Sequence, residues 1–439
     1  MTKPSENALF SLLSGEESDG PCRDIPDSAC RQEPGNFARH VAALSASKVA
    51  DGLVDPKLVL SWLLTVLGAP AAMIGLLVPI REAGALLPQL FTAGALRRMA
   101  QRKWAWAGAA IGQGAGALAI GLAAFTLEGW AAGAAILGAL GVLALCRSVA
   151  SVTHKDVLGK TVAKSRRGTA TGAAGTVAAA AVLVFGGFLV VLPGHRMEVV
   201  LAGLCAAGIA WIYAGFIFAR IIESPGETED GQSTLKLAVH NLRVLKDGQL
   251  QRFILTRGLL IATALAPPYM VSLAARQSGV EFEDAFGGLG LLVIASALAG
   301  LVSSYVWGRL ADVSSRKVLA LTALAAALSL GLTVLLSRAG LLMAVWALPV
   351  VLFGLMVAYQ GVRIGRSTHL VDMATAETRA AYTALSNTVI GTLLLAGGAF
   401  GLAAQAYGEE AVLFVFALLS LAAVPAALSL KEVQAENPS

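Results

Sequence analysis

The sequence predicts an all-α membrane protein that crosses the bilayer many times. Of its 439 residues, 56% are hydrophobic and only 14% are charged, and the mean hydropathy is +0.71. Soluble domains do not have this composition. The hydrophobic runs reach the roughly 20 residues that one helical span needs. They lack the alternation of polar and apolar residues that a membrane β-barrel requires, so we expect the spans to be helices.

Hydrophobic runs recur along the chain and divide it into two parts around a polar stretch at 221–250. Allowing about 20 residues per span, we expect twelve transmembrane helices, six on each side of that stretch. The runs lie at 38–67, 70–96, 104–125, 129–152, 168–193, 197–220, 252–275, 285–308, 316–337, 340–362, 380–405 and 410–430. The first run contains Asp55-Pro56, which could instead break it. The expected organisation is a disordered cytoplasmic tail (1–37), a six-helix bundle (38–220), a cytoplasmic linker (221–250), a second six-helix bundle (251–430) and a cytoplasmic tail (431–439).

Basic residues gather in the loops on one side of the predicted membrane. The loops on the side of the N-terminal tail contain Arg97, Arg98, Arg102, Lys103, Lys155, Lys160, Lys164, Arg166, Arg167, Lys236, Arg243, Lys246, Arg309, Arg316 and Lys317. The opposite loops offer Arg196, Arg276 and Arg338. By the positive-inside rule both termini are cytoplasmic, and the expected location is the inner or plasma membrane of the cell. The formal net charge of +5 therefore indicates orientation in the bilayer and not a nucleic-acid partner.

The two parts of the chain also match as a repeat. Gly94, Leu96, Arg102 and Lys103 recur 214 residues later as Gly308, Leu310, Arg316 and Lys317, and Thr153-His154 recurs 215 residues later as Thr368-His369. Matches in the same order and at nearly the same spacing indicate duplicated halves. Because an even number of spans separates them, the halves keep the same orientation and relate by an axis along the membrane normal.

The loop Gly308-Arg309-Leu310-Ala311-Asp312, followed by Arg316-Lys317, resembles the signature between spans 8 and 9 of the major facilitator superfamily. Its counterpart keeps Gly94, Arg102 and Lys103 but has Arg98 where the aspartate of the signature would fall. Arg147 resembles the membrane-embedded arginine of that family, and Asp51 lies where many members carry an acidic residue. The resemblance implies two six-helix bundles that move a solute by alternating access, with Gly94, Arg98, Arg102, Gly308, Asp312 and Arg316 forming gating loops. The proline-containing antiporter motif of span 5 is missing, so drug export is not supported.

Ionisable residues lie inside the first two predicted spans. Asp51 shares one helix face with Lys48 and Asp55, and Arg81-Glu82 follows Pro79, which tends to kink a helix. An ionisable group inside a span costs about 2.5–3.5 kcal/mol on insertion scales, so each is a functional hypothesis by default. Asp51 and Glu82 are candidates for carrying a proton. The alternative is that these side chains extend to the membrane surface.

Arginines form a second group of candidates. Arg147 and its repeat partner Arg363 lie in spans 4 and 10, Arg366 is one turn beyond, and Gln360 lies three residues before Arg363. Arg257 precedes Pro267-Pro268 in span 7. Convergent guanidinium groups suit carboxylates or phosphates, so the residues weakly favour an anionic substrate. In the competing interpretation, the arginines pair with Asp51, Asp156 or Asp372 and lock the inner gate.

No motif indicates a cofactor, a metal site or catalysis. The four cysteines lack metal-ligand spacing, and we expect them to be reduced. A nucleotide-binding glycine loop is missing from the sequence, so ATP-driven transport would need another chain. The sequence therefore predicts a monomeric secondary transporter for a small solute, not an enzyme, with coupling to protons as a hypothesis. The alternative is a membrane scaffold or assembly factor that has the same fold but transports nothing.

Overall fold

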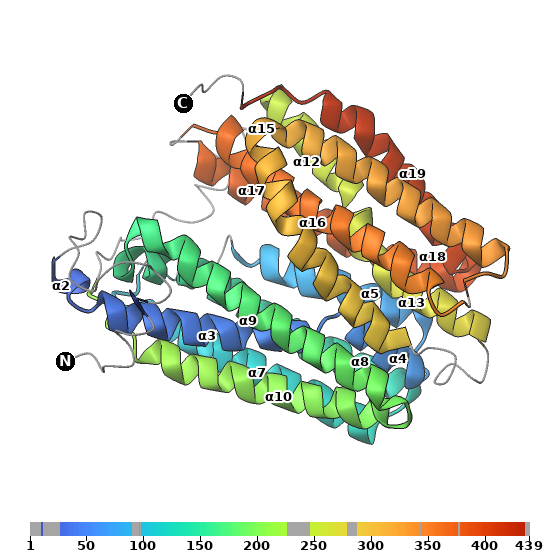
Figure 1. Ribbon diagram of the computed structural model, residues 1–439, viewed down its shortest axis with the longest axis horizontal. Helices are drawn as coiled ribbons and strands as arrows, with labels where there is room; N and C mark the ends of the chain where they lie inside the picture. The colour runs from blue at the N-terminus through green and yellow to red at the C-terminus, as the bar shows by residue number, and fades with distance from the viewer. Residues whose placement is uncertain are drawn as a thin grey trace.

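The computed structural model describes residues 10–11, 27–89, 96, 98–225, 246–278, 288–342, 344–375 and 378–434. Helices dominate these residues, and no β-strand occurs among them (Figure 1). Nine of the described helices are long and apolar enough to cross a membrane. The chain is therefore a multi-pass helical membrane protein, as its composition predicts.

The helices of the first part begin with the short α2 and end with α10. Their bounds are α2 Asp27–Cys30, α3 Glu33–Leu53, α4 Val59–Val66, α5 Ala71–Leu86, α7 Lys103–Thr126, α8 Gly129–Thr161, α9 Lys164–Val191, the 3₁₀ turn η1 Pro193–His195, and α10 Arg196–Ala219. In the second part they are α12 Gly248–Leu260, α13 Ala262–Ser278, α15 Gly288–Arg338, α16 Ala347–Met373, α17 Arg379–Gly397, α18 Ala399–Tyr407 and α19 Glu409–Leu428.

Breaks interrupt the helices, and the first, inside the predicted span 38–67, has a local cause. Asp55 accepts hydrogen bonds from the backbone N–H groups of Lys57 at 2.7 Å and Leu58 at 3.2 Å, and Pro56 cannot donate to a helix. These two residues separate α3 from α4, so Asp55 caps a turn and does not extend the polar stripe of α3. Ser314, with φ −163° and ψ 99°, divides α15 into two helical segments. The predicted spans 285–308 and 316–337 fall on either side of this break; the total of twelve spans remains a prediction.

Helix packing brings distant parts of the chain together (Figure 1). In one region α3 contacts α9 and α10, while α7 contacts α8 and α10. In another, α15 contacts α16 and α19. Two helices connect these regions, because α5 packs against both α8 and α17, and α15 packs against α9. One continuous apolar core runs through both regions, from Ala50 to Ala417.

The structure corrects three boundaries of the predicted segments. Helix α3 begins at Glu33, and Glu33, Asn36 and Phe37 are buried, so residues 33–37 belong to the packed helix. Asn36 exchanges hydrogen bonds with the backbone of Ile222, with its amide donating at 3.0 Å and its Oδ1 accepting at 2.9 Å. Residues 221–225 are therefore part of the fold. At the other end, the predicted linker stops where α12 begins, at Gly248, and not at residue 250. The rest of the predicted linker and most of the predicted N-terminal tail lie outside the described residues.

One expectation about the cysteines is wrong. Cys30, at the end of α2, is disulfide-bonded, whereas Cys146 and Cys205 are free thiols. The composition of the polar segment gave no sign of this bond.

Candidate functional site

Asp51 of α3 holds two arginines from two other helices. Its Oδ1 accepts from Nη2 of Arg81 on α5 at 2.6 Å, and its Oδ2 is 2.6 Å from Nη1 of Arg147 on α8. All three side chains are at least two-thirds buried. An ion pair is strong where water is scarce, so this arrangement ties three helices together. For Arg147 the structural interpretation, pairing with Asp51, is the one that the geometry supports.

Two lysines place further positive charge near this triad. Lys48, one turn before Asp51, donates to the carbonyl oxygen of Thr171 on α9 at 2.8 Å, and Arg363 of α16 is among the charges that act on it. Lys57, in the break after α3, is 8% exposed and lies 3.7 Å from the ring centroid of Tyr359 on α16. Lys57 therefore connects the first part of the chain to α16, while Lys48 connects α3 to α9.

Glu82 is the carboxylate that faces these cations. Among the described residues it makes no hydrogen bond or ion pair, but the fields of Lys57, Arg81, Arg366 and Arg363 act on it, in decreasing order. The adjacent Arg81 points instead to Asp51, as expected for neighbours about 100° apart on a helix. Within the part of the chain that the structure describes, Arg363 donates only to Gln360 of its own helix, at 3.3 Å.

Arg257 of α12 is buried without a carboxylate partner. It is 6% exposed, and its Nη1 donates to the hydroxyl of Ser386 on α17. Both terminal nitrogens approach Oδ1 of Asn387, at 3.5 and 3.4 Å, and the guanidinium lies 5.7 Å from the ring centroid of Phe253. Its Nε has no hydrogen-bond partner among the described residues. The charge that acts on Arg257 most is another cation, Arg366.

The eight residues singled out inside the spans thus form one connected group, which we call the central cluster together with Lys48 and Lys57. Its members are Lys48, Asp51, Lys57, Arg81, Glu82, Arg147, Arg257, Gln360, Arg363 and Arg366. Cations outnumber carboxylates in this cluster. Sequence reasoning missed Lys57, Ser386 and Asn387. The Asp55-Pro56 break was the available signal for Lys57, because it turns the chain back toward the interior.

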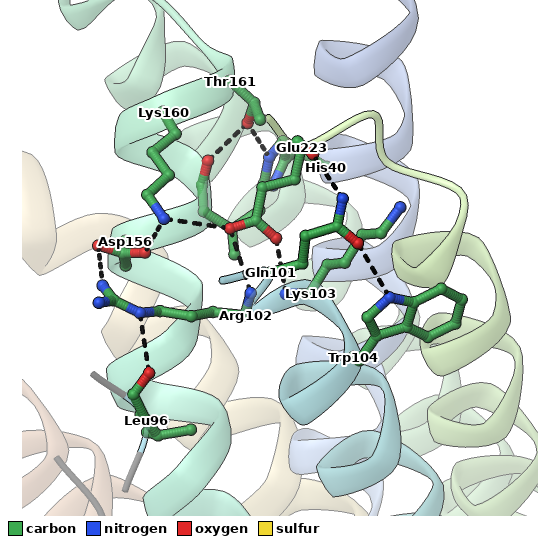
Figure 2. A network of polar contacts seen from close by, with 11 residues as sticks. His40, Leu96, Gln101, Arg102, Lys103, Trp104, Asp156, Lys160, Thr161 and Glu223 are labelled. Atoms are coloured by element: carbon green, nitrogen blue, oxygen red, sulfur yellow. Dashed lines mark hydrogen bonds and ion pairs between the residues drawn. The ribbon is translucent and has the colours of Figure 1, made fainter. Parts of the chain in front are cut away.

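A polar network surrounds the start of α7 (Figure 2). Glu223 is 3% exposed and accepts from the backbone N–H groups of Arg102 at 3.2 Å and Lys103 at 2.9 Å. Its carboxylate thus caps the positive end of the α7 dipole. Arg102 pairs with Asp156 of α8 at 2.5 Å, and Lys160 lies 3.0 Å from Asp156 and 3.3 Å from Glu223. Sequence reasoning overlooked Glu223, which lay in the expected linker.

A similar network lies at the Ser314 break of α15. Arg316 Nε donates to Glu432 at 2.9 Å, and Ser314 donates to the same carboxylate at 2.5 Å. Gln434 accepts from the backbone of Ser315 at 3.0 Å and donates to Asp372 at 2.7 Å. The repeat partners Arg102 and Arg316 therefore each donate to a carboxylate that follows a helix, Arg102 through its backbone N–H to Glu223 and Arg316 through its side chain to Glu432. Residues 432–434 belong to this contact and not to a free tail.

The remaining gating-loop candidates do not join these networks. Arg98 and Asp312 are exposed, and neither has a hydrogen bond or ion pair among the described residues. Gly308 has open space around its Cα, so no close approach requires a glycine there. Gly94 lies outside the described residues.

The described residues contain no group of three or more His, Cys, Asp or Glu side chains that could hold a metal ion. The ring of His369, which the sequence placed near Asp372, instead shares a hydrogen bond with Ser315 at 2.8 Å. What the central cluster can do chemically is bind an anion and hold or release a proton on a carboxylate.

Comparison with known proteins connects this geometry to a class. No family model matches the sequence, and no curated protein matches it. The fold is similar to that of the nucleoside transporter NupG, with a TM-score of 0.67 at 13% identity over 90% of this chain and 98% of that one. A mutant of NupG gives a TM-score of 0.67 at 14% identity, over 90% and 100% of the two chains. A POT family transporter in complex with a thioalcohol-conjugated peptide gives 0.69 at 10% identity, over 92% and 98%.

Identities this low show the fold alone. The chain is therefore a multi-pass membrane protein with the fold of these solved transporters, and its charged residues gather where helices from both parts of the chain meet.

Proposed function

We propose that this protein is a secondary transporter of the major facilitator type, which moves a small anionic solute across the cell membrane by alternating access. In this proposal, residues 33–220 and 248–430 are two parallel-related bundles of six spans each, and both termini are cytoplasmic. The central cluster carries the proposal, because it contains cations from both bundles inside otherwise apolar helices. The similarity to transporter folds over nearly the whole chain supports it.

The chemistry of the cluster suggests how such a cycle would work. Asp51 neutralises part of the charge of Arg81 and Arg147 within the first bundle, while Arg363 and Arg366 of the second have no carboxylate bound to them among the described residues. A bound anion would supply the missing negative charge and bring the two bundles together around itself. Because charges attract strongly where water is excluded, the occupied state would favour closure.

Coupling to protons would involve Glu82 or Asp51. Glu82 faces cations of both bundles without a direct partner, so a substrate anion would compete with its negative charge. Protonation of Glu82 on substrate binding would relieve that competition and link proton movement to solute movement. Asp51 is held by two arginines and is the less accessible of the two carboxylates.

The test is flux in liposomes that contain the purified protein. Preloaded vesicles should accumulate labelled organic anions in a saturable manner, and a pH gradient should change the initial rate. Glu82→Gln should abolish the response to the pH gradient while anion exchange continues. If flux in the wild-type protein does not respond to the pH gradient, the hypothesis of proton coupling is wrong. If no flux driven by a solute or pH gradient occurs, the scaffold alternative is favoured.

A further inference from the structure

Within the proposed transporter, on which this inference rests, we propose that Arg257, Arg366, Ser386 and Asn387 form a binding site for a doubly charged oxyanion group, such as the phosphate of a phosphate monoester. We call these four residues the oxyanion site. It lies between α12, α16 and α17, and the sequence analysis had recognised only its two arginines as separate candidates.

The first observation is the unmet bonding capacity of Arg257. A guanidinium carries five N–H donors, and a buried one is expensive unless those donors and its charge are matched. Arg257 is 6% exposed, yet its Nε has no partner and its contacts to Asn387 are as long as 3.5 Å. No carboxylate is bound to it among the described residues. Among the described residues, Nε is thus a buried donor still available to an oxygen of an anion.

The second observation is the convergence of further donors on the same place. Arg366 of α16 is half-buried, has no hydrogen bond or ion pair among the described residues, and acts electrostatically on Arg257. Helices α12 and α16 are adjacent here, because Phe253 stacks on His369 at 5.5 Å between ring centroids. Ser386 is fully buried and Asn387 is half-buried. A hydroxyl and an amide beside two guanidinium groups are the donors that an oxyanion needs.

The charge and the number of donors decide the class of ligand. Two guanidinium groups that repel each other are both neutralised by one dianion, whereas a single carboxylate would leave one of them unmatched. A phosphate monoester also presents several oxygens around one centre, so it can accept from both arginines, Ser386 and Asn387 together. Two carboxylates on one molecule would need two separated groups of donors.

The experiment is a thermal-shift titration of the purified, detergent-solubilised full chain at pH 7.5 and constant ionic strength. Inorganic phosphate and glycerol 3-phosphate should raise the melting temperature of the wild-type protein at lower concentrations than acetate or succinate, since a bound ligand stabilises the folded state. Arg257→Gln and Arg366→Gln should each weaken the phosphate response at least tenfold. Arg252→Gln is the matched control, because Arg252 lies on the same helix but is exposed.

Two further variants keep the test informative if Arg257→Gln fails to fold. Arg257→Lys keeps the charge but loses the fork, and Asn387→Ala keeps both arginines; each should still weaken phosphate binding. Equal responses to acetate and phosphate, or a phosphate response unchanged in Arg366→Gln and Asn387→Ala, would overturn the oxyanion site. Site-dependent phosphate binding without liposome flux would instead contradict transport and leave the site intact. Saturable flux of uncharged solutes that is unchanged in Arg257→Gln and Arg366→Gln would support transport and contradict the oxyanion site.

Discussion

Single residues in this protein act through charge in a place with little water. Asp51 has two arginine partners at 2.6 Å, whereas Glu82, 31 positions later in the chain, has none among the described residues. The two carboxylates therefore differ in what their removal should do: one stabilises the packing of helices, and the other responds to the charge in the central cluster.

Replacing Asp51 by Asn should destabilise the protein by about 2 kcal/mol, because two arginines would be left without their counter-charge. This value is smaller than for a fully buried ion pair, because Arg147 is partly exposed. The melting temperature in detergent measures this. Asp312→Asn removes an exposed carboxylate without such partners among the described residues, and it should leave the melting temperature unchanged. Equal melting of Asp51→Asn and wild type would show that the ion pairs contribute no net stability.

Replacing Glu82 by Gln should not destabilise the protein, unlike the replacement of Asp51. The protein should melt at or above the wild-type temperature, because no direct ion pair is lost, and it should bind anions more tightly, because the competing carboxylate is gone. Titration of wild type and Glu82→Gln with inorganic phosphate compares the affinities. Weaker binding in Glu82→Gln would mean that Glu82 contacts the ligand and does not compete with it.

Helix ends form the next scale, and two of them are capped by carboxylates. Glu223 caps α7 from a position 120 residues later. Asp247 caps α12, accepting from the N–H of Gln249 at 2.8 Å. In both cases the cap also ties the helix end to another helix, through Lys160 of α8 for Glu223 and through Tyr382 of α17 for Asp247.

Replacing Glu223 by Ala should cost about 2–3 kcal/mol, because two backbone N–H groups and Lys160 lose a buried acceptor. Glu223→Gln keeps one acceptor oxygen and should cost less. The difference in melting temperature between the two variants measures the contribution of the cap. If both melt together near wild type, water replaces the carboxylate at the end of α7.

Asp247 provides a prediction of pH dependence. The hydrogen bond from Tyr382 lowers the pKa of this carboxyl below its ordinary value of 3.8. A carboxyl whose pKa is lower in the folded state stabilises fully above its ordinary pKa, and this contribution is lost as the pH falls through the lower folded value. Asp247→Ala should cost about 1 kcal/mol at pH 7. Asp247→Asn should retain the cap but lose the acid sensitivity, which melting curves between pH 3 and 7 would show.

At the scale of the whole molecule, close contacts between helices from the two parts of the chain matter most. Gly290 of α15 lies against α9, where an added Cβ would be 2.7 Å from the carbonyl oxygen of Gly186 and 2.8 Å from the backbone nitrogen of Val190. A similar contact joins Gly75 of α5 to Gly401 of α18, where a Cβ added to Gly75 would lie 2.6 Å from the Cα of Gly401. Backbone cannot move aside as a side chain can, so these contacts fix how closely the two parts approach.

Replacing Gly290 by Ala should therefore force α9 and α15 apart, cost about 1–3 kcal/mol, and slow the flux predicted for the wild type. Gly187→Ala is the matched control, because no atom lies within 4 Å of the position of its Cβ. Melting temperature and liposome flux should both separate the two variants. If Gly290→Ala behaves like Gly187→Ala, the contact is not a constraint on the transport cycle.

The class of architecture follows from the sequence alone, because a membrane span is a local property: about 20 apolar residues specify a helix in the bilayer wherever they occur. The break at Asp55-Pro56 and the candidates for the central cluster were predictable for the same reason, since a charge in an apolar run is visible in the chain itself.

The partners of those charges depend on how the helices pack. Asp51 meets Arg81 across 30 positions and Arg257 meets Ser386 across 129, and no local pattern records such distances. Periodicity showed which face of a helix is polar but not which helix that face touches, so Lys57, Glu223, Ser386 and Asn387 were missed. Packing assigned Asp51 to a structural pair, left Glu82 facing cations without one, and left Arg257 with an unmatched donor, because burial and proximity are properties of the folded chain.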